Sequence, residues 1–245
     1  MIGYLKRKRK TKMDIQKKLY WLIQAGVYRF CNEKTTQIPV SEQKESALKE
    51  RSAVDVALQQ ATTAKNLSDL NQQKQAFSLS SLKKTAAHTL LGIGTARPKL
   101  MCVLEMPDTD ADRTGDPLIG AQATQLVKMM TAIQLDIEKE VYITYLSPWR
   151  TPGNRPLTLS ERSLFLPFLI QEIQLVHPKL ILLFGAGLAK ALLAQESLAK
   201  ARGIWHTWQS IPCRVTLALA ALKTTPLRQQ AWTDLQEVQK KLSTF

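Results

Sequence analysis

Short apolar segments alternate with amphipathic segments through the second part of the chain. Four of these segments are nearly continuous runs of aliphatic, β-branched and aromatic residues, as is typical of strands buried on both faces of a sheet. The predicted strands cover residues 99–105, 141–146, 179–185 and 213–219. Because helical segments separate these runs, we expect a parallel sheet that is covered by helices on both faces.

Between and after the predicted strands, apolar residues recur at the three- and four-residue spacing of a helix face. The predicted helices cover residues 119–135, 158–176, 187–194 and 227–242. Thr158 and Glu161 have the spacing of a capping box, which marks the start of the second of these helices. Pro167 lies inside the same helix, where a proline removes a backbone hydrogen bond and can break the helix in two.

The region before residue 78 has a different pattern. The apolar positions of residues 13–30 share one helical face, and the Ala-, Gln- and Lys-rich segment 43–76 also favours a helix. We therefore predict a basic arm and helical N-terminal extension over residues 1–77. Residues 78–245 are expected to form one three-layer α/β/α domain with a central four-stranded parallel sheet.

The chain is strongly basic, and its excess of positive charge is uneven. The 34 Lys and Arg residues outnumber the 20 Asp and Glu residues by 14, and residues 1–18 alone hold eight cationic residues and one Asp. Such an imbalance favours polyanionic partners such as nucleic acid. A run of like charge is also compatible with a solvated arm, which is the ordinary role of such segments. The hydrophobic content of 44% excludes wholesale disorder.

Cysteine usage and hydropathy favour a cytoplasmic protein. Cys31, Cys102 and Cys213 are an odd number at wide spacing, which fits neither a disulfide framework nor a four-ligand metal site. Polar residues follow the basic run 6–12, where a secretory signal would be apolar. Proline and polar residues interrupt the most apolar stretch, 164–176. We therefore expect no membrane span, no secretory signal and no metal site.

Polar and basic residues follow the predicted strands, and ligand sites of parallel α/β sheets lie beyond the carboxyl ends of the strands. The segment WRTPGNRP (149–156) places Arg150, Asn154 and Arg155 in one such loop. Arginine forks and polar loops of this kind bind phosphate groups. Arg202 opens a second arginine–aromatic segment, RGIWHTW. These residues indicate nucleic acid but no particular reaction.

Two other patterns have an ordinary structural interpretation. GAG (185–187) follows a predicted strand but lacks the third glycine and the Lys-Ser/Thr pair of phosphate-binding loops, so a tight strand-to-helix turn is favoured. The acidic residues of 105–112 offer oxygen ligands but lack the glycine and terminal glutamate of a calcium loop, so we expect a solvated loop. Glu105 differs from the other acids because it stands at the end of a buried strand.

The order of several segments along the chain resembles one protein family. The matching segments are LKKTAAHTLLG (82–92), LEMPDTDADRTGDPLIG (104–120), VYITYLSPWRTPGNRP (141–156) and LALAALKTTPLRQQAWTDL (217–235). Together they are similar to the family-4 type uracil-DNA glycosylases, in their alphaproteobacterial form. The resemblance implies the three-layer fold of that family, a bacterial cytoplasmic location, a monomer, and DNA as the partner.

The reaction that the resemblance implies is base excision, in which uracil is flipped out of DNA and its N-glycosidic bond is hydrolysed. By resemblance, the family histidine that donates to the departing uracil falls on Leu217, and the asparagine that reads the base falls on Tyr145. The stacking phenylalanine falls on Leu118. Glu105 is retained, and we expect it to orient the attacking water. Lys223, in the last matching segment, joins the arginines as an expected DNA contact.

The family's iron–sulfur cluster is expected to be absent. Its cysteine positions fall near Phe77, Ser80, Trp149 and Phe165, and none of these side chains ligates iron. We therefore expect no cofactor.

Residues that shape the family's fold are kept while residues of its pocket are replaced, and two functions follow from this. The first is a DNA-repair glycosylase with an altered pocket and weakened or lost uracil excision. The second is a non-catalytic DNA-binding relative, and an excision assay discriminates between them. A basic RNA- or ribosome-associated protein is a third class, which rests on the N-terminal arm alone.

Overall fold

The computed structural model describes residues 40–245, so the basic arm and the helix predicted over 13–30 lie outside the described residues. Six strands form a sheet in the order β1-β3-β2-β4-β6-β5. They are β1 (Ile93–Gly94), β2 (Leu100–Leu104), β3 (Val141–Tyr145), β4 (Leu180–Phe184), β5 (Trp205–Trp208) and β6 (Ile211–Thr216). The neighbours among β2, β3, β4 and β6 pair in parallel, which confirms the predicted core of the sheet.

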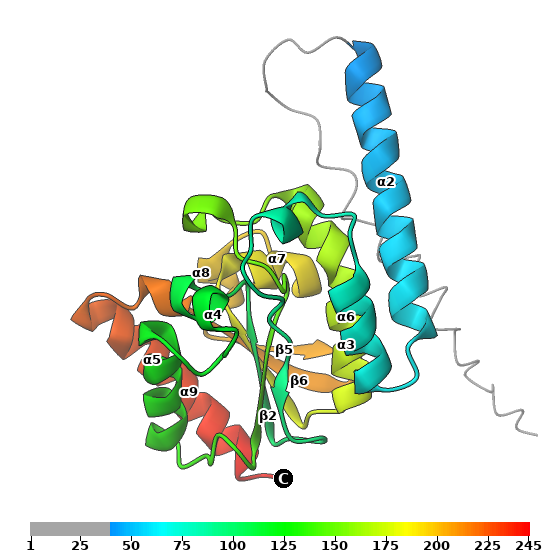
Figure 1. Cartoon of the computed structure of the whole chain (residues 1–245). Helices are drawn as coiled ribbons and strands as arrows, with labels where there is room; N and C mark the ends of the chain where they lie inside the picture. Colours follow the sequence, from blue (N-terminus) through cyan, green and yellow to red (C-terminus); the bar gives the residue numbers. More distant parts are fainter. Residues whose placement is uncertain (1–39) are drawn as a thin grey trace, which may run out of the picture. The chain divides into compact units, whose positions relative to one another are not determined.

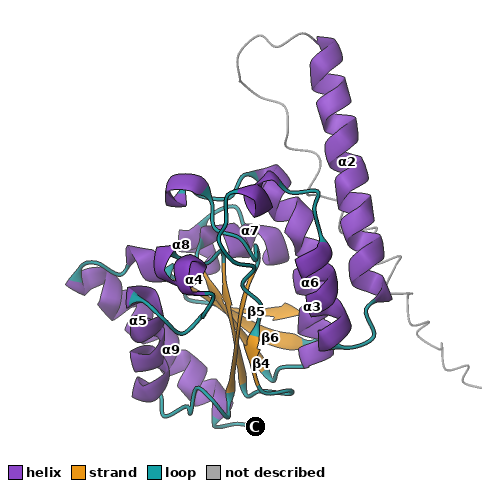
Figure 2. Cartoon of the chain, in the orientation of Figure 1, coloured by secondary structure: helices purple, strands orange, loops and turns teal. Residues whose placement is uncertain are grey.

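Helices cover both faces of this sheet, with α5 and α9 on one side and α3 and α6 on the other (Figure 1, Figure 2). The described α-helices are α2 (Val40–Thr63), α3 (Leu67–Ala76), α4 (Thr109–Thr114), α5 (Ala121–Ala132), α6 (Leu159–Val176), α7 (Ala186–Leu193), α8 (Leu198–Ala201) and α9 (Thr225–Leu242). Short 3-10 turns are η2 (Ser81–Lys84), η3 (Pro152–Asn154) and η4 (Leu219–Ala221). The three-layer α/β/α architecture expected from the sequence is confirmed.

The sheet is wider than the predicted four strands, because two short antiparallel strands extend its edges. β1 pairs with β3, and β5 pairs with β6. The turn between β5 and β6 consists of Gln209 and Ser210, whose φ angles are 45° and 78°. Glycine or asparagine usually occupies such left-handed turn positions, so the sequence carries no hairpin signal there. β6 also begins and ends earlier than predicted: residues 217 and 218 belong to the loop that follows it, and Leu219 begins η4.

The apolar core on the α5–α9 side collects alternate residues of the parallel strands. Because side chains alternate between the two faces of a strand, β2, β3 and β4 each contribute every second residue to this cluster. The buried members from the strands are Leu100, Cys102, Leu104, Val141, Ile143, Tyr145, Leu180, Leu182 and Phe184. Leu126 and Met130 of α5 and Leu235 of α9 belong to the same cluster.

A buried polar network ties the opposite face of the sheet to α6. Glu172 of α6 has no exposed surface. Its carboxylate accepts hydrogen bonds from Lys74 Nζ at 2.7 Å, Tyr142 Oη at 3.0 Å and Thr144 Oγ1 at 2.7 Å. A buried carboxylate is tolerated because it is paired and hydrogen-bonded. The network joins α3, α6 and β3 on this face of the sheet.

α6 is one unbroken helix, although Pro167 lies inside it. Its capping box is present: Thr158 accepts from the backbone of Glu161, whose side chain accepts from the backbone of Thr158. The helix is buried over most of its length, and packing of this kind offsets the hydrogen bond that a proline removes.

α2 packs on α6 through a stripe of small side chains. The buried positions of this stripe are Val54, Ala57 and Ala61, with Ala64 just after the helix. Gln171 of α6 donates to the backbone oxygen of Ala64 at 3.0 Å. The domain boundary between residues 77 and 78 stays a prediction, and the described helices before it lie against the sheet-bearing part of the chain.

Candidate functional site

The carboxyl ends of the parallel strands lie at one edge of the sheet. Backbone hydrogen bonds join the loops that follow the strands there. Leu146 N donates to Leu104 O at 2.8 Å, and Ser147 N donates to Glu105 O at 3.0 Å. Gly185 N donates to Thr216 O at 2.9 Å, which joins the loops after β4 and β6. The segments expected to form the site from their order in the sequence therefore meet in space, as sheets of this kind require.

Glu105 lies at this edge in an ion pair with an arginine of α6. Arg162 Nε donates to Glu105 Oε1 at 2.8 Å, and both side chains are mostly covered, with 17% and 23% of their surface exposed. A Cβ atom on Gly187 would lie 2.3 Å from Glu105 Oε1, so glycine is needed there for the carboxylate to fit. Sequence reasoning missed Arg162, because no local pattern links it to a residue 57 positions earlier.

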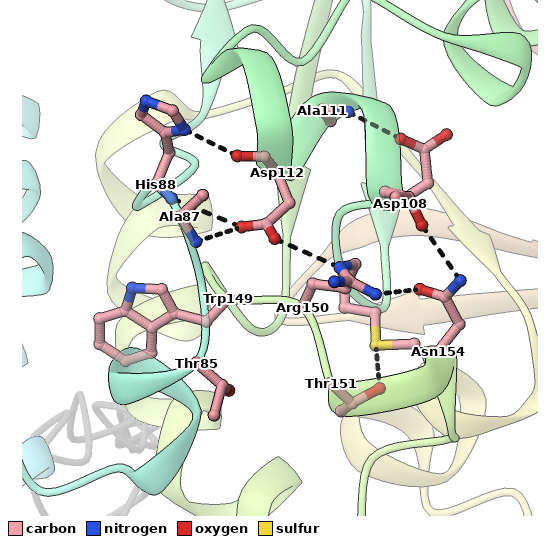
Figure 3. Close-up of polar contacts among 12 residues, drawn as sticks. Thr85, Ala87, His88, Asp108, Ala111, Asp112, Trp149, Arg150, Thr151 and Asn154 are labelled. Carbon is pink, nitrogen blue, oxygen red and sulfur yellow. Dashed lines mark hydrogen bonds and ion pairs between the residues drawn. The ribbon is translucent and has the colours of Figure 1, made fainter.

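Asp112 organises the loop that carries the predicted phosphate-binding residues (Figure 3). Its carboxylate accepts from Ala87 N at 3.0 Å and from Arg150 Nε at 3.3 Å. Arg150 Nη1 in turn donates to Asn154 Oδ1 at 3.3 Å. Asp112 is only 5% exposed, so these bonds join the 82–92 segment, α4 and the WRTPGNRP loop through one buried carboxylate.

The turn inside the WRTPGNRP loop places two residues in the left-handed backbone conformation, and the sequence has glycine and asparagine at these positions. Gly153 and Asn154 both have left-handed backbones, with φ angles of 65° and 56°. Glycine and asparagine adopt this conformation at low cost. The Arg155 guanidinium that follows binds Glu161 with two hydrogen bonds, of 2.8 and 2.6 Å. This contact, together with Thr158, holds the pKa of the Glu161 carboxyl below its ordinary value.

Tyr145 and the residues around it form a narrow pocket at the end of β2 and β3. The pocket has a volume of about 10 Å³, which holds about one water molecule. Its lining residues are Leu104, Met106, Asp108, Ala111, Pro117, Ile119, Gln122, Ala123, Leu126, Tyr145 and Leu219. Burial raises the pKa of the Tyr145 hydroxyl, and the nearby carboxylates of Asp108 and Asp116 add to that shift. The hydroxyl therefore keeps its proton and can act only as a neutral donor or acceptor.

The other two positions that the resemblance assigns to base recognition lie in different surroundings. Leu217 is 7% exposed and belongs to the main apolar cluster, so it offers no proton to a departing base. Leu118 is 37% exposed in the loop between α4 and α5 and does not line the narrow pocket. Tyr145 is the one of these three residues that the structure places in the pocket.

Arg202 makes its contacts with α9. Its Nε and Nη2 atoms donate to Asp234 Oδ2 at 2.9 and 2.8 Å, and Nη1 donates to Gln230 Oε1 at 2.7 Å. Asp234 also accepts from Arg214 and Thr216 of β6, and it is 1% exposed. The prediction that Arg202 contacts DNA stays untested, and its guanidinium already serves a buried carboxylate. Lys223, by contrast, is exposed after η4.

Three of the four positions where the resemblance places cluster cysteines hold buried aromatic rings: Phe77, Trp149 and Phe165. The fourth is Ser80, a buried residue whose side chain accepts a hydrogen bond from Leu82 N at 3.2 Å. The three rings and Phe168, which packs on Phe77, are here called the aromatic cluster. Trp149 and Phe165 meet edge to face with ring centroids 5.6 Å apart, and Phe77 and Phe168 do so at 5.2 Å. Trp149 Nε1 donates to Thr89 Oγ1 at 3.0 Å. Phenyl and indole groups supply no ligand to iron, so these residues do not fit an iron–sulfur cluster.

Acidic residues at the site serve local structure. Asp108 caps α4 by accepting from Ala111 N at 2.9 Å, and Asp110 pairs with Arg113. Within residues 40–245, no group of three or more His, Cys, Asp or Glu side chains lies close enough to hold a metal ion. No described helix has the length and apolar character that a membrane span needs.

The fold and its loops define the class first: a three-layer α/β protein with a polar and basic site at the carboxyl edge of a mostly parallel sheet. A family model described as the uracil DNA glycosylase superfamily matches residues 91–236, which is more than half of the chain. The chain belongs to the uracil DNA glycosylase superfamily.

Three relatives carry the same name, Type-4 uracil-DNA glycosylase. The chain is 26% identical over 172 residues to that of Saccharolobus solfataricus, covering 66% of this chain and 80% of the relative. It is 29% identical over 170 residues to that of Pyrobaculum aerophilum, with 67% and 85% covered. It is 29% identical over 120 residues to that of Archaeoglobus fulgidus, with 49% and 60% covered. The resemblance to the family-4 type is thereby confirmed.

Proposed function

We propose that this protein is a uracil-DNA glycosylase-like DNA-repair protein whose excision of uracil is weakened or lost. The observation that carries this proposal is the narrow pocket beside Tyr145. A volume of about 10 Å³ holds about one water molecule, and a flipped pyrimidine is several times larger. Substrate entry would require the pocket walls to move before any chemistry begins.

The residue types around the site support the same proposal. A glycosylase must read the edge of the flipped base and stabilise the negative charge that builds on the departing base. Leu217 has no donor to supply, and loss of one such donor typically lowers the rate about 10²–10³-fold. Tyr145 has a single hydroxyl where an asparagine can form paired hydrogen bonds with a base edge. These penalties are not additive, since residues that act as a unit rarely are.

Glu105 is the acidic group that we propose for water positioning. It stands after β2 at the carboxyl edge of the sheet, and the Arg162 ion pair fixes its carboxylate. A fixed carboxylate oxygen can accept a hydrogen bond from a water and orient it for attack. The second oxygen has no hydrogen-bond partner among the described residues and is the one available for this role.

DNA binding is proposed to use the loops at the same edge. Arg150, Asn154 and Arg155 lie on the WRTPGNRP loop, and Lys223 lies on the loop after β6. Arg155 is exposed and Arg150 is partly exposed, and both are held by carboxylates that orient their guanidinium groups. Orientation of this kind lowers the entropy lost when a phosphate binds, while bulk charge supplies the attraction.

A non-catalytic DNA-binding relative is the second candidate. This alternative is favoured by the burial of Leu217 in the apolar core, because a side chain packed in the core is not available to contact a substrate. In this case the site edge binds DNA and no bond is broken.

The deciding experiment is restoration of activity. Excision of uracil from single- and double-stranded oligonucleotides is measured under single-turnover conditions for the unaltered protein, for Tyr145→Asn, and for Tyr145→Asn combined with Leu217→His. Asparagine is smaller than tyrosine, so it both opens the pocket and supplies paired hydrogen bonds. We expect the double variant to excise uracil at least about tenfold faster than the unaltered protein, a part of the 10²–10³ that one donor contributes.

Tyr145→Phe is the matched control, because it removes the hydroxyl and keeps the ring. If the unaltered protein excises uracil at the rate of a Type-4 relative and Glu105→Gln abolishes the activity, the proposed loss is wrong. If all variants bind uracil-containing DNA and none excises it, the non-catalytic alternative is favoured. Unfolding curves of each variant show whether a negative result comes from lost folding.

A further inference from the structure

An open groove of about 450 Å³ runs between α5 and α9, on the side of α5 that faces away from the narrow pocket. The two helices lie side by side in Figure 1. The groove is lined by Ala121, Thr124, Gln125, Lys128, Met129, Ala132, Leu222, Arg228, Ala231, Trp232 and Leu235. On each helix the lining residues recur every three or four positions, so each helix offers one continuous stripe to the groove.

The surface of this groove is apolar and includes an exposed indole. Met129 of α5 and Leu235 of α9 form part of the floor, and Trp232 is 41% exposed at its side. The indole of Trp232 adds exposed apolar surface to the apolar lining of the groove. Tryptophan is also among the side chains that contribute most to protein–protein binding.

The charge of the groove is one-sided. Its lining includes Lys128 from α5 and Arg228 from α9 but no carboxylate. Arg228 Nε donates to Leu222 O at 3.0 Å, which holds the guanidinium at the groove. Among the described residues, neither cation lies within ion-pair distance of an acidic side chain; on α9 Asp234 is paired with Arg202 and Arg214, and Glu237 with Lys240.

We propose that this groove binds an amphipathic helix of a protein partner, with apolar side chains in the groove and acidic side chains against Lys128 and Arg228. Recognition of a helix in an apolar groove uses anchors at positions i, i+3, i+4 and i+7. From Ala121 to Ala132 the groove extends along α5 for about 16 Å, at 1.5 Å per residue, which matches three turns of a partner helix.

The position of the groove separates it from the proposed DNA edge. Gln122, Ala123 and Leu126 line the narrow pocket, whereas Thr124, Gln125 and Lys128 line the groove, so the two sites use different faces of α5. No residue of the WRTPGNRP loop lines the groove, and Lys223, which directly follows the lining residue Leu222, is the proposed DNA contact nearest to it. The proposal therefore does not depend on whether the protein excises uracil.

The test uses the full chain and a fluorescently labelled model helix that carries leucines at i, i+3, i+4 and i+7 and glutamates beside them. Binding is followed by fluorescence anisotropy at low and at high salt. We expect saturable binding that weakens as salt is added, because exposed charge pairs are screened. Trp232→Ala is expected to weaken binding roughly 30-fold, the effect of losing one central aromatic anchor.

Charge reversal tests the second half of the proposal. Lys128→Glu, alone and combined with Arg228→Glu, is expected to weaken binding of the glutamate peptide and to tighten binding of a matched peptide with lysines in place of the glutamates. The Lys128 side chain makes no hydrogen bond or ion pair among the described residues, so we expect the single variant to keep the fold intact. Ile204→Ala, at a residue that is 53% exposed, and Lys241→Glu on α9 are the matched controls outside the groove.

Four results would overturn the proposal. They are absence of saturable binding, equal affinity of the unaltered protein for both peptides, equal effects of Trp232→Ala and Ile204→Ala, and unchanged peptide preference after charge reversal. Two other occupants are also examined with the same variants. If Trp232→Ala weakens binding of a single-stranded oligonucleotide, or if it dissociates a dimer of this chain in solution, the groove belongs to nucleic acid or to a second copy instead.

Discussion

The aromatic cluster and the narrow pocket both occupy positions where the family resemblance places functional groups, and they differ in what replaced those groups. In the aromatic cluster, Trp149 and Phe165 are each 1% exposed and their rings meet edge to face. Tyr145 lines the pocket of about 10 Å³, and Leu217 lies outside this pocket, in the apolar core. Buried rings pack on one another in the aromatic cluster, whereas the three positions that the resemblance assigns to base recognition offer a single polar group, the Tyr145 hydroxyl.

The two regions therefore differ in what their side chains can do. The aromatic cluster joins segments that are distant in sequence through buried ring contacts. The pocket must present donors to a base, a task that packing cannot perform. The comparison therefore separates a region that stabilises the fold by packing from a region whose chemical function we propose to be reduced.

The iron content of the purified protein tests the role given to the aromatic cluster most directly, because a bound iron–sulfur cluster is either present in stoichiometric amount or absent. Because aromatic side chains do not ligate iron, the anaerobically purified full chain is expected to contain neither iron nor acid-labile sulfide in stoichiometric amounts. Elemental analysis and visible absorbance check this. Stoichiometric iron and sulfide would contradict the structural role given to the aromatic cluster.

The largest energetic effect is expected at the centre of the aromatic cluster. Phe165→Ala removes a buried ring that packs on Trp149, and it is expected to lower the free energy of unfolding by roughly 3–5 kcal/mol. Leu118→Ala is the control, because Leu118 is exposed and should change stability by less than about 0.5 kcal/mol. Urea unfolding of both variants measures the difference. Similar effects at the two positions would mean that the cluster does not stabilise the fold.

A smaller effect is expected when a polar group returns to the pocket region. Leu217→His places an imidazole in the apolar cluster and is expected to cost about 1–3 kcal/mol of stability, the usual price of an unpaired buried polar group. Tyr145→Phe should cost less than about 1 kcal/mol, because its hydroxyl has no hydrogen-bond partner among the described residues. If Leu217→His leaves the free energy of unfolding unchanged, position 217 accepts a polar side chain, and the contrast between the aromatic cluster and the pocket region becomes weaker.

The salt dependence of DNA binding tests the loops at the carboxyl edge of the sheet. Arg155→Ala and Lys223→Ala are each expected to lower the slope of log affinity against log salt by about 0.9 on duplex DNA, or about 0.7 on a single strand. Deletion of residues 1–12 should lower it further. Arg202→Ala is the contrasting variant. Its side chain is 17% exposed and binds the buried carboxylate of Asp234, whereas the Arg155 side chain is 44% exposed, so Arg202→Ala should reduce stability and leave the slope unchanged. An unchanged slope in Arg155→Ala together with the deletion would contradict the nucleic-acid interpretation.

The smallest effect concerns acid stability at the start of α6. The pKa of Glu161 is lowered in the folded protein by Arg155 and Thr158, so the contact stabilises the fold above the ordinary carboxyl pKa near 4.5. This stabilisation is lost as pH falls through the lowered pKa, because the folded carboxylate must then take up a proton. The difference in melting temperature between the unaltered protein and Glu161→Gln is expected to shrink from about pH 7 to about pH 3. A constant difference would show that the ion pair contributes nothing.

The sequence by itself determined the parallel core of the sheet and the helices that cover it. Runs such as KLILLFG are apolar on both faces, and few structures other than a strand between two helix layers bury such a run. Thr158 and Glu161 marked the start of α6 correctly, since a capping box is a local interaction. The order of the strand-end loops was also sufficient to indicate which segments meet at one edge.

Only the tertiary structure decided which charged groups are already engaged and how much room the site has. Arg202 reads in the sequence as a phosphate contact, yet its donors are held by Asp234, which lies 32 residues away along the chain. Glu105 is fixed by Arg162, and the turn from β5 into β6 depends on backbone angles that residues such as Gln209 and Ser210 rarely adopt. Local patterns record the propensity of a segment, whereas ion pairs and pocket volumes depend on distances between segments, and those distances exist only after the helices have packed on the sheet.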